Sequence, residues 1–281
     1  MTDKRVLTFQ DISCVGQCSL TVALPIISAC GVETVILPSA VLSTHTGGKF
    51  EGYTFRDLTD DIPNIMNHWI KQGLKFDCLY TGYLGSIKQI DFVISLYNNV
   101  INPGGKLIVD PAMADFGKLY YGFDHDFVKA MARLCGMADI ILPNLTEAAM
   151  MTDTEIRLDN HDEAYIQNIL NKLAEMGAKT IVLKGICFEE GKIGVAVYES
   201  SNKSIQYYFT KKLDRISHGT GDCYAAAFTG ALMQNRNVIE SARVAADFVV
   251  DCIEKTMDDE KHWYGVKFEK ALTMLVNELN R

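Results

Sequence analysis

Short apolar runs alternate with longer amphipathic stretches along most of this chain. The apolar runs have the length and β-branched content of strands, and they cover residues 5–9, 33–38, 76–82, 106–110, 138–144 and 179–185. Between them, apolar positions recur every three or four residues, which predicts helices in stretches that include 54–72, 86–100 and 161–176. This alternation predicts an α/β fold in which helices cover both faces of a mostly parallel sheet.

The last third of the chain follows a different pattern. Two alternating runs, 192–200 and 204–210, lie on either side of a polar turn and predict an antiparallel hairpin added to the sheet. Helices are then predicted at about 221–234, 237–257 and 266–279. Since no repeat or linker divides the chain, we expect a single domain over residues 1–281.

Charge and composition narrow the class of partner. The net charge of −8 argues against a broad surface for nucleic acid or anionic lipid, so we expect a small-molecule partner, with no nucleic acid and no membrane. No run approaches the length of a membrane span, and the start of the chain lacks the features of a secretory signal, which favours a cytoplasmic protein. The eight cysteines are scattered through mostly apolar segments and are expected to be reduced.

The stretch SHGTGDCYAAAFTGALM, residues 217–233, places Gly219, Thr220, Gly221 and Asp222 at a predicted helix start. Glycines let the backbone turn and bring its N–H groups close to an anion, and a helix N-terminus attracts negative charge. Asp222 has two readings here: a carboxylate that only satisfies the helix start, or a general base for phosphoryl transfer to an alcohol. The chain lacks a Walker A loop, and its first βα turn lacks the dinucleotide-binding glycines.

Polar residues also follow two predicted strands. Asp110 ends one strand, and Asn144 with Glu147 follows another. Ligands of open α/β sheets bind beyond the carboxyl ends of the strands, and Mg²⁺ prefers oxygen ligands of this kind. Taken alone, Asn144 is equally well explained as a helix cap, and Glu147 as a partner of the helix dipole.

These motifs together resemble a known family. The segments STHTGG (43–48), TGYLGS (81–86), VDPAMADFGKLY (109–120), LPNLTEAAMMT (142–152) and HGTGD (218–222) resemble the pyridoxal kinase branch of the ribokinase-like superfamily, and the N-terminal passage is most similar to bacterial pyridoxamine kinases. The resemblance implies a ribokinase-like three-layer α/β/α fold. It also implies ATP-dependent phosphorylation of the 5′-hydroxymethyl group of a vitamin B6 vitamer, pyridoxamine or pyridoxal.

The resemblance also implies roles for individual residues. Asp222 would be the catalytic base, and Gly219, Thr220 and Gly221 would form the anion hole. ATP would contact Asp110, Asn144, Glu147, Lys184 and Gly221, and Asp110 and Glu147 would hold Mg²⁺. Substrate contacts are expected from Asp11, Ser19, His45, Thr46 and Tyr83. The family further implies a homodimer and a monovalent cation such as K⁺ beside the ATP site.

Three positions depart from the family pattern. Asp11 stands where many pyridoxal kinases have serine, and an anion there would favour pyridoxamine by pairing with its amine or with a protonated ring nitrogen. Lys184-Gly185 is similar to hydroxymethylpyrimidine kinases, and Lys184 could contact ATP phosphates or simply reach solvent. Ala114 replaces a usual glycine, which makes Asp115 a weaker candidate for contact with phosphate.

Three other functions stay open at this point. The first is a kinase of hydroxymethylpyrimidine or another small alcohol, and the second is a non-catalytic B6-binding protein. The third is a redox regulator that uses the Cys14 and Cys18 pair. An intact Asp222 beside the glycines disfavours the binding protein, because a carrier needs no base next to an anion hole.

Overall fold

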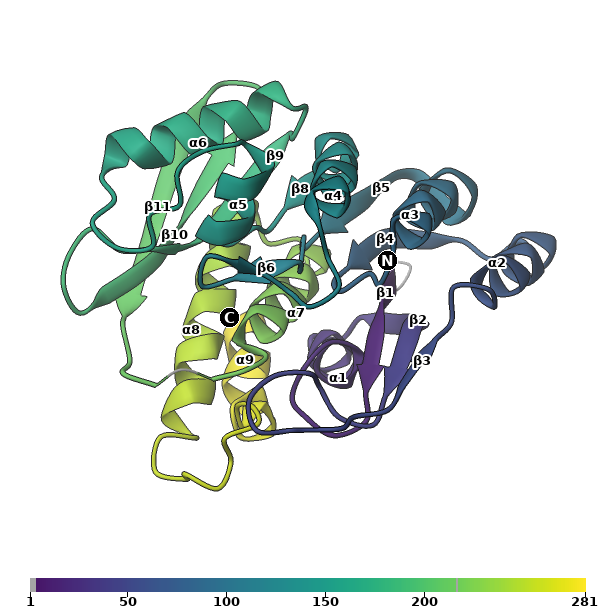
Figure 1. The fold of residues 1–281 in the computed structure, drawn as a ribbon, viewed down its shortest axis with the longest axis horizontal. Coiled ribbons are helices and arrows are strands. Elements are labelled where there is room, and N and C mark those ends of the chain that lie inside the picture. The colour runs from purple at the N-terminus through teal and green to yellow at the C-terminus, as the bar shows by residue number, and fades with distance from the viewer. Residues whose placement is uncertain (1–3, 216) are drawn as a thin grey trace.

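A nine-stranded sheet runs through the centre of the molecule, as Figure 1 shows. The computed structural model describes residues 4–215 and 217–281. The strand order is β11-β10-β9-β8-β5-β4-β1-β2-β3. The bounds are β1 Arg5–Ser13, β2 Glu33–Leu42, β3 Phe55–Asp57, β4 Phe76–Thr81, β5 Ile101–Val109, β8 Ile140–Ile141, β9 Thr180–Ile186, β10 Lys192–Glu199 and β11 Ser204–Lys211. The six strands from β2 to β9 in this order pair in parallel, whereas β3, β10 and β11 are antiparallel to their neighbours.

Helices cover both faces of the sheet, in three layers. One face carries α2 Ile62–Lys71, α3 Ile87–Val100, α4 His125–Met137, α5 Leu145–Met151 and α6 Glu163–Glu175. The other face carries α1 Leu20–Ala29, α7 Thr220–Met233, α8 Val238–Glu254, the short 3₁₀ helix η1 Phe268–Lys270 and α9 Leu272–Leu279. A small hairpin, β6 Ala114–Asp115 with β7 Lys118–Leu119, forms a separate two-stranded sheet. The three-layer fold inferred from the alternating pattern is therefore confirmed.

Two apolar cores lie on opposite sides of the sheet. Successive residues of β1 alternate between them, so Leu7 packs with α2–α6 and Val6 packs with α1, α7 and α8. Helix α7 is buried along most of its length because small residues let its neighbours approach closely. At Gly230, for example, a β-carbon would overlap the side chain of Cys30 at the end of α1. Helix α7 is thereby held in place, with its N-terminus at the carboxyl edge of the parallel strands.

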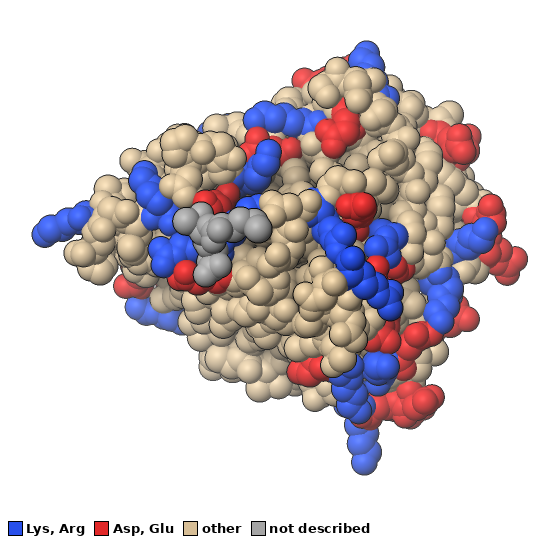
Figure 2. Space-filling model, turned by 180° about the vertical axis from the view of Figure 1, so that it is seen from behind, with Lys and Arg blue, Asp and Glu red and all other residues tan. Residues whose placement is uncertain are grey.

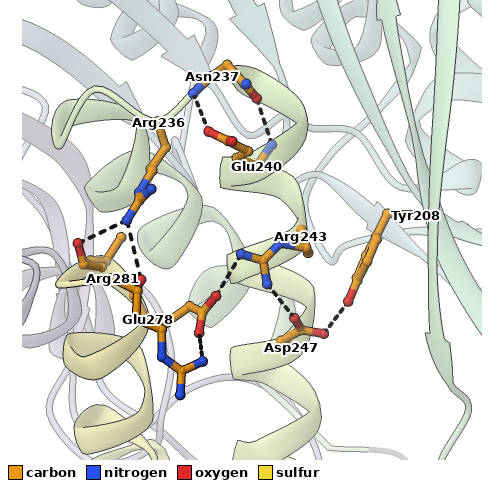
Figure 3. A network of polar contacts seen from close by, with 9 residues as sticks. Tyr208, Arg236, Asn237, Glu240, Arg243, Asp247, Glu278 and Arg281 are labelled. Atoms are coloured by element: carbon orange, nitrogen blue, oxygen red, sulfur yellow. Dashed lines mark hydrogen bonds and ion pairs between the residues drawn. The ribbon is translucent and has the colours of Figure 1, made fainter.

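A polar network joins the antiparallel edge of the sheet to α8 and α9 (Figure 3). The hydroxyl of Tyr208 donates to Asp247 at 2.7 Å, and Arg243 donates to Asp247 at 3.3 Å. Arg243 also donates to Glu278 of α9 at 2.7 Å, and Arg281 donates to the second oxygen of Glu278 at 2.9 Å. These contacts fix α8 and α9 against each other. They lie away from the edge of the sheet that carries the predicted site.

The structure corrects several element boundaries. The predicted hairpin is confirmed as β10 and β11, and the predicted helices at 86–100 and 161–176 correspond to α3 and α6. The stretch 54–72 is only partly helical, because Phe55–Asp57 pairs with β2 as an edge strand before α2 begins. The expected helix at 266–279 is split into η1 and α9. The strand expected at 138–144 contributes only Ile140–Ile141 to the ladder.

Two observations concern the helices and one face of the surface. Within the described residues, no helix is long and apolar enough to cross a membrane. On the face shown in Figure 2, basic and acidic side chains lie interspersed. This face therefore offers no single basic surface of the kind that binds nucleic acid.

Candidate active site

The predicted site residues gather at one edge of the sheet. Asp11 lies near the end of β1, Asp110 directly follows β5, and Lys184 lies near the end of β9. His45 and Tyr83 follow β2 and β4, and Asn144 follows β8. Because parallel strands end at the same edge, the fold brings together residues that are far apart in the sequence.

Lys184 and Asp110 form an ion pair at the centre of this edge. The ammonium of Lys184 donates to both carboxylate oxygens of Asp110, each at 3.1 Å, and both side chains are largely buried. Burial by itself would lower the pKa of Lys184, but the charges of Asp110, Glu147 and Asp222 outweigh it and raise that pKa. Burial also raises the pKa of Asp110, and Lys184 opposes that rise. Lys184 is therefore a fixed cation, and the prediction that it simply reaches solvent is wrong.

Asn144 and Glu147 bind each other's backbone at the start of α5. The amide of Glu147 donates to the side chain of Asn144 at 2.9 Å, and the amide of Asn144 donates to Glu147 at 2.8 Å. This is a capping box, so the capping role considered for Asn144 is realised, and Glu147, considered as a partner of the helix dipole, lies in the first turn and caps the backbone as well. Burial, and then the nearby Asp110, raise the pKa of Glu147 to about 8. A capped carboxyl with such a pKa takes up a proton readily unless a cation is beside it.

The start of α7 has the geometry of an anion site. Gly219 has φ +74°, and a β-carbon there would overlap the backbone oxygen of Gln17, so only glycine fits. Gly221 is exposed, and a β-carbon at Gly221 would lie 3.9 Å from the ammonium of Lys184. The start of α7, where a helix attracts anions, therefore lies next to a fixed cation.

Asp222 lies in the first turn of α7. Burial, and then the charges of Asp110 and Asp11, raise its pKa to about 7, and Lys184 and the Ser19 amide oppose that rise. A carboxylate that only capped the helix would gain from the dipole and have a lowered pKa. A pKa near neutrality is instead what a general base needs at the pH of the cell.

Asp11 is buried near Asp222. The hydroxyl of Ser13 donates to Asp11 at 3.0 Å. Burial raises the pKa of Asp11, and hydrogen bonds from Ser19 and Ser13 partly offset that rise. Ser19 is buried at the start of α1, with φ +53°. The structure thus places Asp11 and Ser19 together beside Asp222.

His45 is buried, and both of its ring nitrogens bond to the protein. Its Nδ1 accepts from the amide of Gly47 at 3.0 Å, so we assign the proton to Nε2, which donates to the backbone oxygen of Tyr264 at 2.9 Å. The ring also lies 5.0 Å from the ring of His218. A substrate could therefore meet the ring of His45 but not a free ring nitrogen. The next residue, Thr46, is exposed.

Tyr83 lies near Asp11 in a partly buried setting. Its ring stacks on Phe123, with centroids 5.4 Å apart. Burial, and then the charge of Asp11, raise the pKa of Tyr83 to about 12, so its hydroxyl keeps its proton. Tyr83 can offer a flat surface together with a hydrogen-bond donor.

The carboxylates of Asp110 and Glu147 are the candidate ligands of a magnesium ion. Among residues 4–215 and 217–281, no three His, Cys, Asp or Glu side chains are grouped closely enough to hold a metal by themselves. Mg²⁺ in kinases is usually held by one or two carboxylates together with water and substrate phosphates, so a protein-only cage is not required. Burial is the main cause of the raised pKa values of Asp110 and Glu147, and a cation beside these carboxyl groups would favour their ionised forms. The donor set therefore fits Mg²⁺ bound together with a nucleotide.

Two further groups at the site carried no signal strong enough to be predicted. Tyr120 follows β7, and burial together with the charges of Glu147, Asp115 and Asp222 raises its pKa. Cys18 lies against Gly219, and burial, Asp222 and Asp11 raise its pKa well above the usual range. A thiol that stays protonated is a poor nucleophile, which disfavours the redox role considered for Cys14 and Cys18.

The chain matches the model of the phosphomethylpyrimidine kinase family over residues 27–266. A candidate phosphomethylpyrimidine kinase of Bacteroides thetaiotaomicron, in a crystal form with pyridoxal, is 34% identical, with a TM-score of 0.91 over 98% of this chain and 96% of its own. Pyridoxal kinase of Lactobacillus plantarum is 30% identical, with a TM-score of 0.88 over 98% of this chain and 97% of its own.

A curated relative is longer. Thiamine biosynthetic bifunctional enzyme TH1 of Arabidopsis thaliana is 23% identical over 84% of this chain, and the chain spans 44% of that enzyme's length. The long family match and the similarity to pyridoxal kinase both agree with the kinase motifs and with the geometry at the start of α7. The chain therefore belongs to the phosphomethylpyrimidine kinase family, and the resemblance to pyridoxal kinases drawn from its motifs is confirmed.

Proposed function

We propose that this protein transfers the γ-phosphoryl group of ATP to the 5′-hydroxymethyl group of a vitamin B6 vitamer, pyridoxamine or pyridoxal. The observation that carries the proposal is Asp222, whose pKa is raised to about 7 at a helix start that faces Lys184. In this reaction Asp222 takes the proton of the substrate alcohol. The amides of Gly219, Thr220 and Gly221 stabilise the negative charge that develops on the phosphoryl group. The ammonium of Lys184 offsets the charge of the phosphoryl oxygens.

The proposal includes Mg²⁺ and the remaining predicted contacts. Asp110 and Glu147 would hold the ion with the ATP phosphates, where it would neutralise phosphate charge. Asn144 orients Glu147 through the capping box. Asp11, Ser19 and Tyr83 surround the vitamer, with the ring of His45 and the exposed Thr46 as the remaining predicted contacts. A homodimer in the cytoplasm, with a monovalent cation such as K⁺ near the ATP site, completes the proposal.

A kinase of hydroxymethylpyrimidine is the second candidate. It is favoured by the description of the matching family and by Lys184-Gly185 at the end of β9. Both substrates are small aromatic alcohols, so the same base and anion site would serve either one. The buried Asp11 favours a substrate with a cationic group, because a carboxylate in this position lacks a cationic partner among the residues named around it.

The test is a turnover assay with four alcohols. Purified protein would be given ATP and Mg²⁺ with pyridoxamine, pyridoxal, pyridoxine or hydroxymethylpyrimidine, as the wild type and as Asp222→Ala. We expect turnover of a B6 vitamer that falls by roughly 10²-fold or more in the variant. Asp126→Asn is a matched control, since Asp126 also lies in the first turn of a helix but is exposed and away from the site. Absence of turnover with all three vitamers would reject the proposal, and turnover of hydroxymethylpyrimidine alone would select the second candidate.

Asp11 provides a separate test of vitamer choice. If its carboxylate pairs with the amine of pyridoxamine, Asp11→Ser should reduce turnover of pyridoxamine more than turnover of pyridoxal. The ratio of kcat/KM values for the two vitamers measures this directly. An unchanged ratio would show that Asp11 does not select the vitamer.

A further inference from the structure

One arginine binds four backbone carbonyl groups of a single loop near the site. Arg215 lies four residues before Gly219, and its partners belong to the loop 255–267 between α8 and η1, here called the α8–η1 loop. The guanidinium donates to the carbonyl oxygens of Thr256 at 2.5 Å and of Met257, Asp259 and His262 at 3.0 Å each. The planar fork of arginine can serve several acceptors at once, which the single ammonium of a lysine cannot do with the same geometry.

The α8–η1 loop in turn holds the segment that follows β2. The backbone oxygen of Tyr264 accepts from His45, and the ring of Trp263 lies 4.7 Å from that of Phe50. A β-carbon at Gly48 would lie 2.8 Å from the ring of Trp263. The loop therefore positions the segment that carries His45 and Thr46.

The α8–η1 loop and η1 also contact Gln17, which packs against Gly219 at the start of α7. The side chain of Gln17 donates to Glu269 of η1 at 2.9 Å, and a β-carbon at Gly265 would overlap Gln17. The backbone oxygen of Gln17 occupies the space that a side chain at position 219 would need. The position of Gly219 thus depends on Gln17, which in turn rests on the α8–η1 loop and η1.

We propose that Arg215 is a positioning residue, which clamps the α8–η1 loop so that this loop holds His45 on the substrate side and Gln17 on the anion-hole side. The structural part of this proposal stands on contacts alone. Its kinetic part rests on the proposed function, because it is measured with a B6 vitamer. Loss of the clamp would loosen the substrate side and the support that Gln17 gives to Gly219, while the ion pair of Lys184 with Asp110 stays in place. We therefore expect the KM for the vitamer to rise by about tenfold or more, with less change in the KM for ATP.

Trp263 gives a readout that needs no activity. The chain has two tryptophans, and Trp69 lies in α2 on the opposite face of the sheet, so Trp69→Phe leaves Trp263 as the only indole. In that background, Arg215→Ala should shift the emission of Trp263 to the red and make it easier to quench with acrylamide. Arg215→Lys keeps the charge without the fork, and it should show the same changes to a smaller extent.

Arg236→Ala is the matched control. Arg236 also donates to two backbone carbonyls, those of Glu278 and Leu279, but it lies beyond the other end of α7, about 21 Å along the helix from Gly219. It should lower the melting temperature without changing the emission of Trp263 or the KM for the vitamer. Equal changes in the Arg236 and Arg215 variants would overturn the proposal, because they would reflect stability alone.

Two further results would also overturn it. One is wild-type emission and wild-type KM in Arg215→Ala. The other is an Arg215→Lys variant that cannot be distinguished from the wild type in either readout, which decides the matter even if Arg215→Ala does not fold. If the wild type phosphorylates no vitamer, the proposed function fails, whereas the emission of Trp263 still tests the clamp.

Discussion

The ammonium of Lys184 lies near the carboxyl groups of Asp110, Glu147 and Asp222, and Asp11 lies near Asp222. Burial is the largest cause of the raised pKa of Asp11, Asp110, Glu147 and Asp222, and Lys184 opposes the rise at three of them. With a pKa of about 8, Glu147 is therefore largely protonated at neutral pH, and Asp222, with a pKa of about 7, is only partly ionised. Substrate amines and divalent cations would favour the ionised forms of these carboxyl groups, which explains why both are expected to bind here.

The pKa of Asp222 predicts the acid side of the pH profile. A base must be deprotonated to act, so kcat/KM should fall as the pH drops below about 7. Asp11 is one of the charges that raise this pKa, so Asp11→Asn should move the acid limb to lower pH. Rates measured from pH 5 to 9 in both proteins would show the shift. Asp139→Asn, a change at a carboxyl outside the site, should leave the limb in place, and an unmoved limb in Asp11→Asn would contradict the proposed coupling.

Residue roles differed in how far the sequence could predict them. The HGTGD motif predicted Asp222 and the glycines, because both the turn and the helix start are local features. The pairing of Lys184 with Asp110 joins residues 74 positions apart, and the contact of His45 with Tyr264 spans 219 positions. No local pattern encodes such pairings. The sequence therefore leaves both phosphate and solvent open as partners of Lys184, and it gives no signal for the contacts of Arg215.

At the scale of elements, the start of α7 combines two glycines with different requirements. Gly219 needs a positive φ and has no room for a side chain, whereas Gly221 has open space in front of it. One glycine thus serves the fold, and the other keeps the space next to Lys184 free.

Alanine at each position separates these requirements. Gly219→Ala should cost more than about 1 kcal/mol of unfolding free energy, because both the backbone strain and the overlap with Gln17 oppose it. Gly221→Ala should unfold close to the wild type but lower kcat/KM, since the new methyl group enters the space expected for phosphate. Thermal unfolding and turnover measured on the same samples test both expectations. A Gly221 variant with full activity would argue against the anion hole.

Elements in the regular part of the sheet were easier to predict than those at its borders. The hydrophobic pattern located the buried parallel strands and α7, since their burial is encoded in their own residues. The edge strand β3 has three exposed residues, and its strand character comes from pairing with β2 rather than from its own pattern. The pattern of residues 54–72 therefore predicts a single helix, although its first residues form a strand.

At the scale of the whole molecule, we expect the buried carboxyl groups to lower the unfolding free energy as the pH rises. An acid whose pKa is raised by folding holds its proton in the folded state after the unfolded chain has lost it, so the unfolding free energy falls as the pH rises toward the folded pKa. The values of about 7 for Asp222 and about 8 for Glu147 give a window up to about pH 8. Burial lowers the pKa values of three histidines, His45, His161 and His218. These histidines make the unfolding free energy rise with pH, but only below about pH 6.5.

The protein without ligands should therefore melt at lower temperature at pH 8.5 than at pH 6.5. Glu147→Gln removes one of the charges while it leaves an oxygen to accept from the amide of Asn144, so it should weaken this dependence. Addition of Mg²⁺ and ATP should weaken it as well, because a cation beside Asp110 and Glu147 would lower their pKa values in the folded state. Melting curves at the two pH values decide the point, and equal slopes in the wild type and the variant would show that Glu147 is not responsible.

The contact between His45 and Tyr264 also has a consequence for synthesis. A ribosome makes the chain from its N-terminus, so the sheet strands β1 to β9 and most of their helices emerge before the loop that holds His45. Helix α7, which carries Asp222, likewise emerges before that loop. The contact of His45 with Tyr264 can therefore form only after the α8–η1 loop has left the exit tunnel, so the proposed substrate side is completed later than the rest of the proposed site.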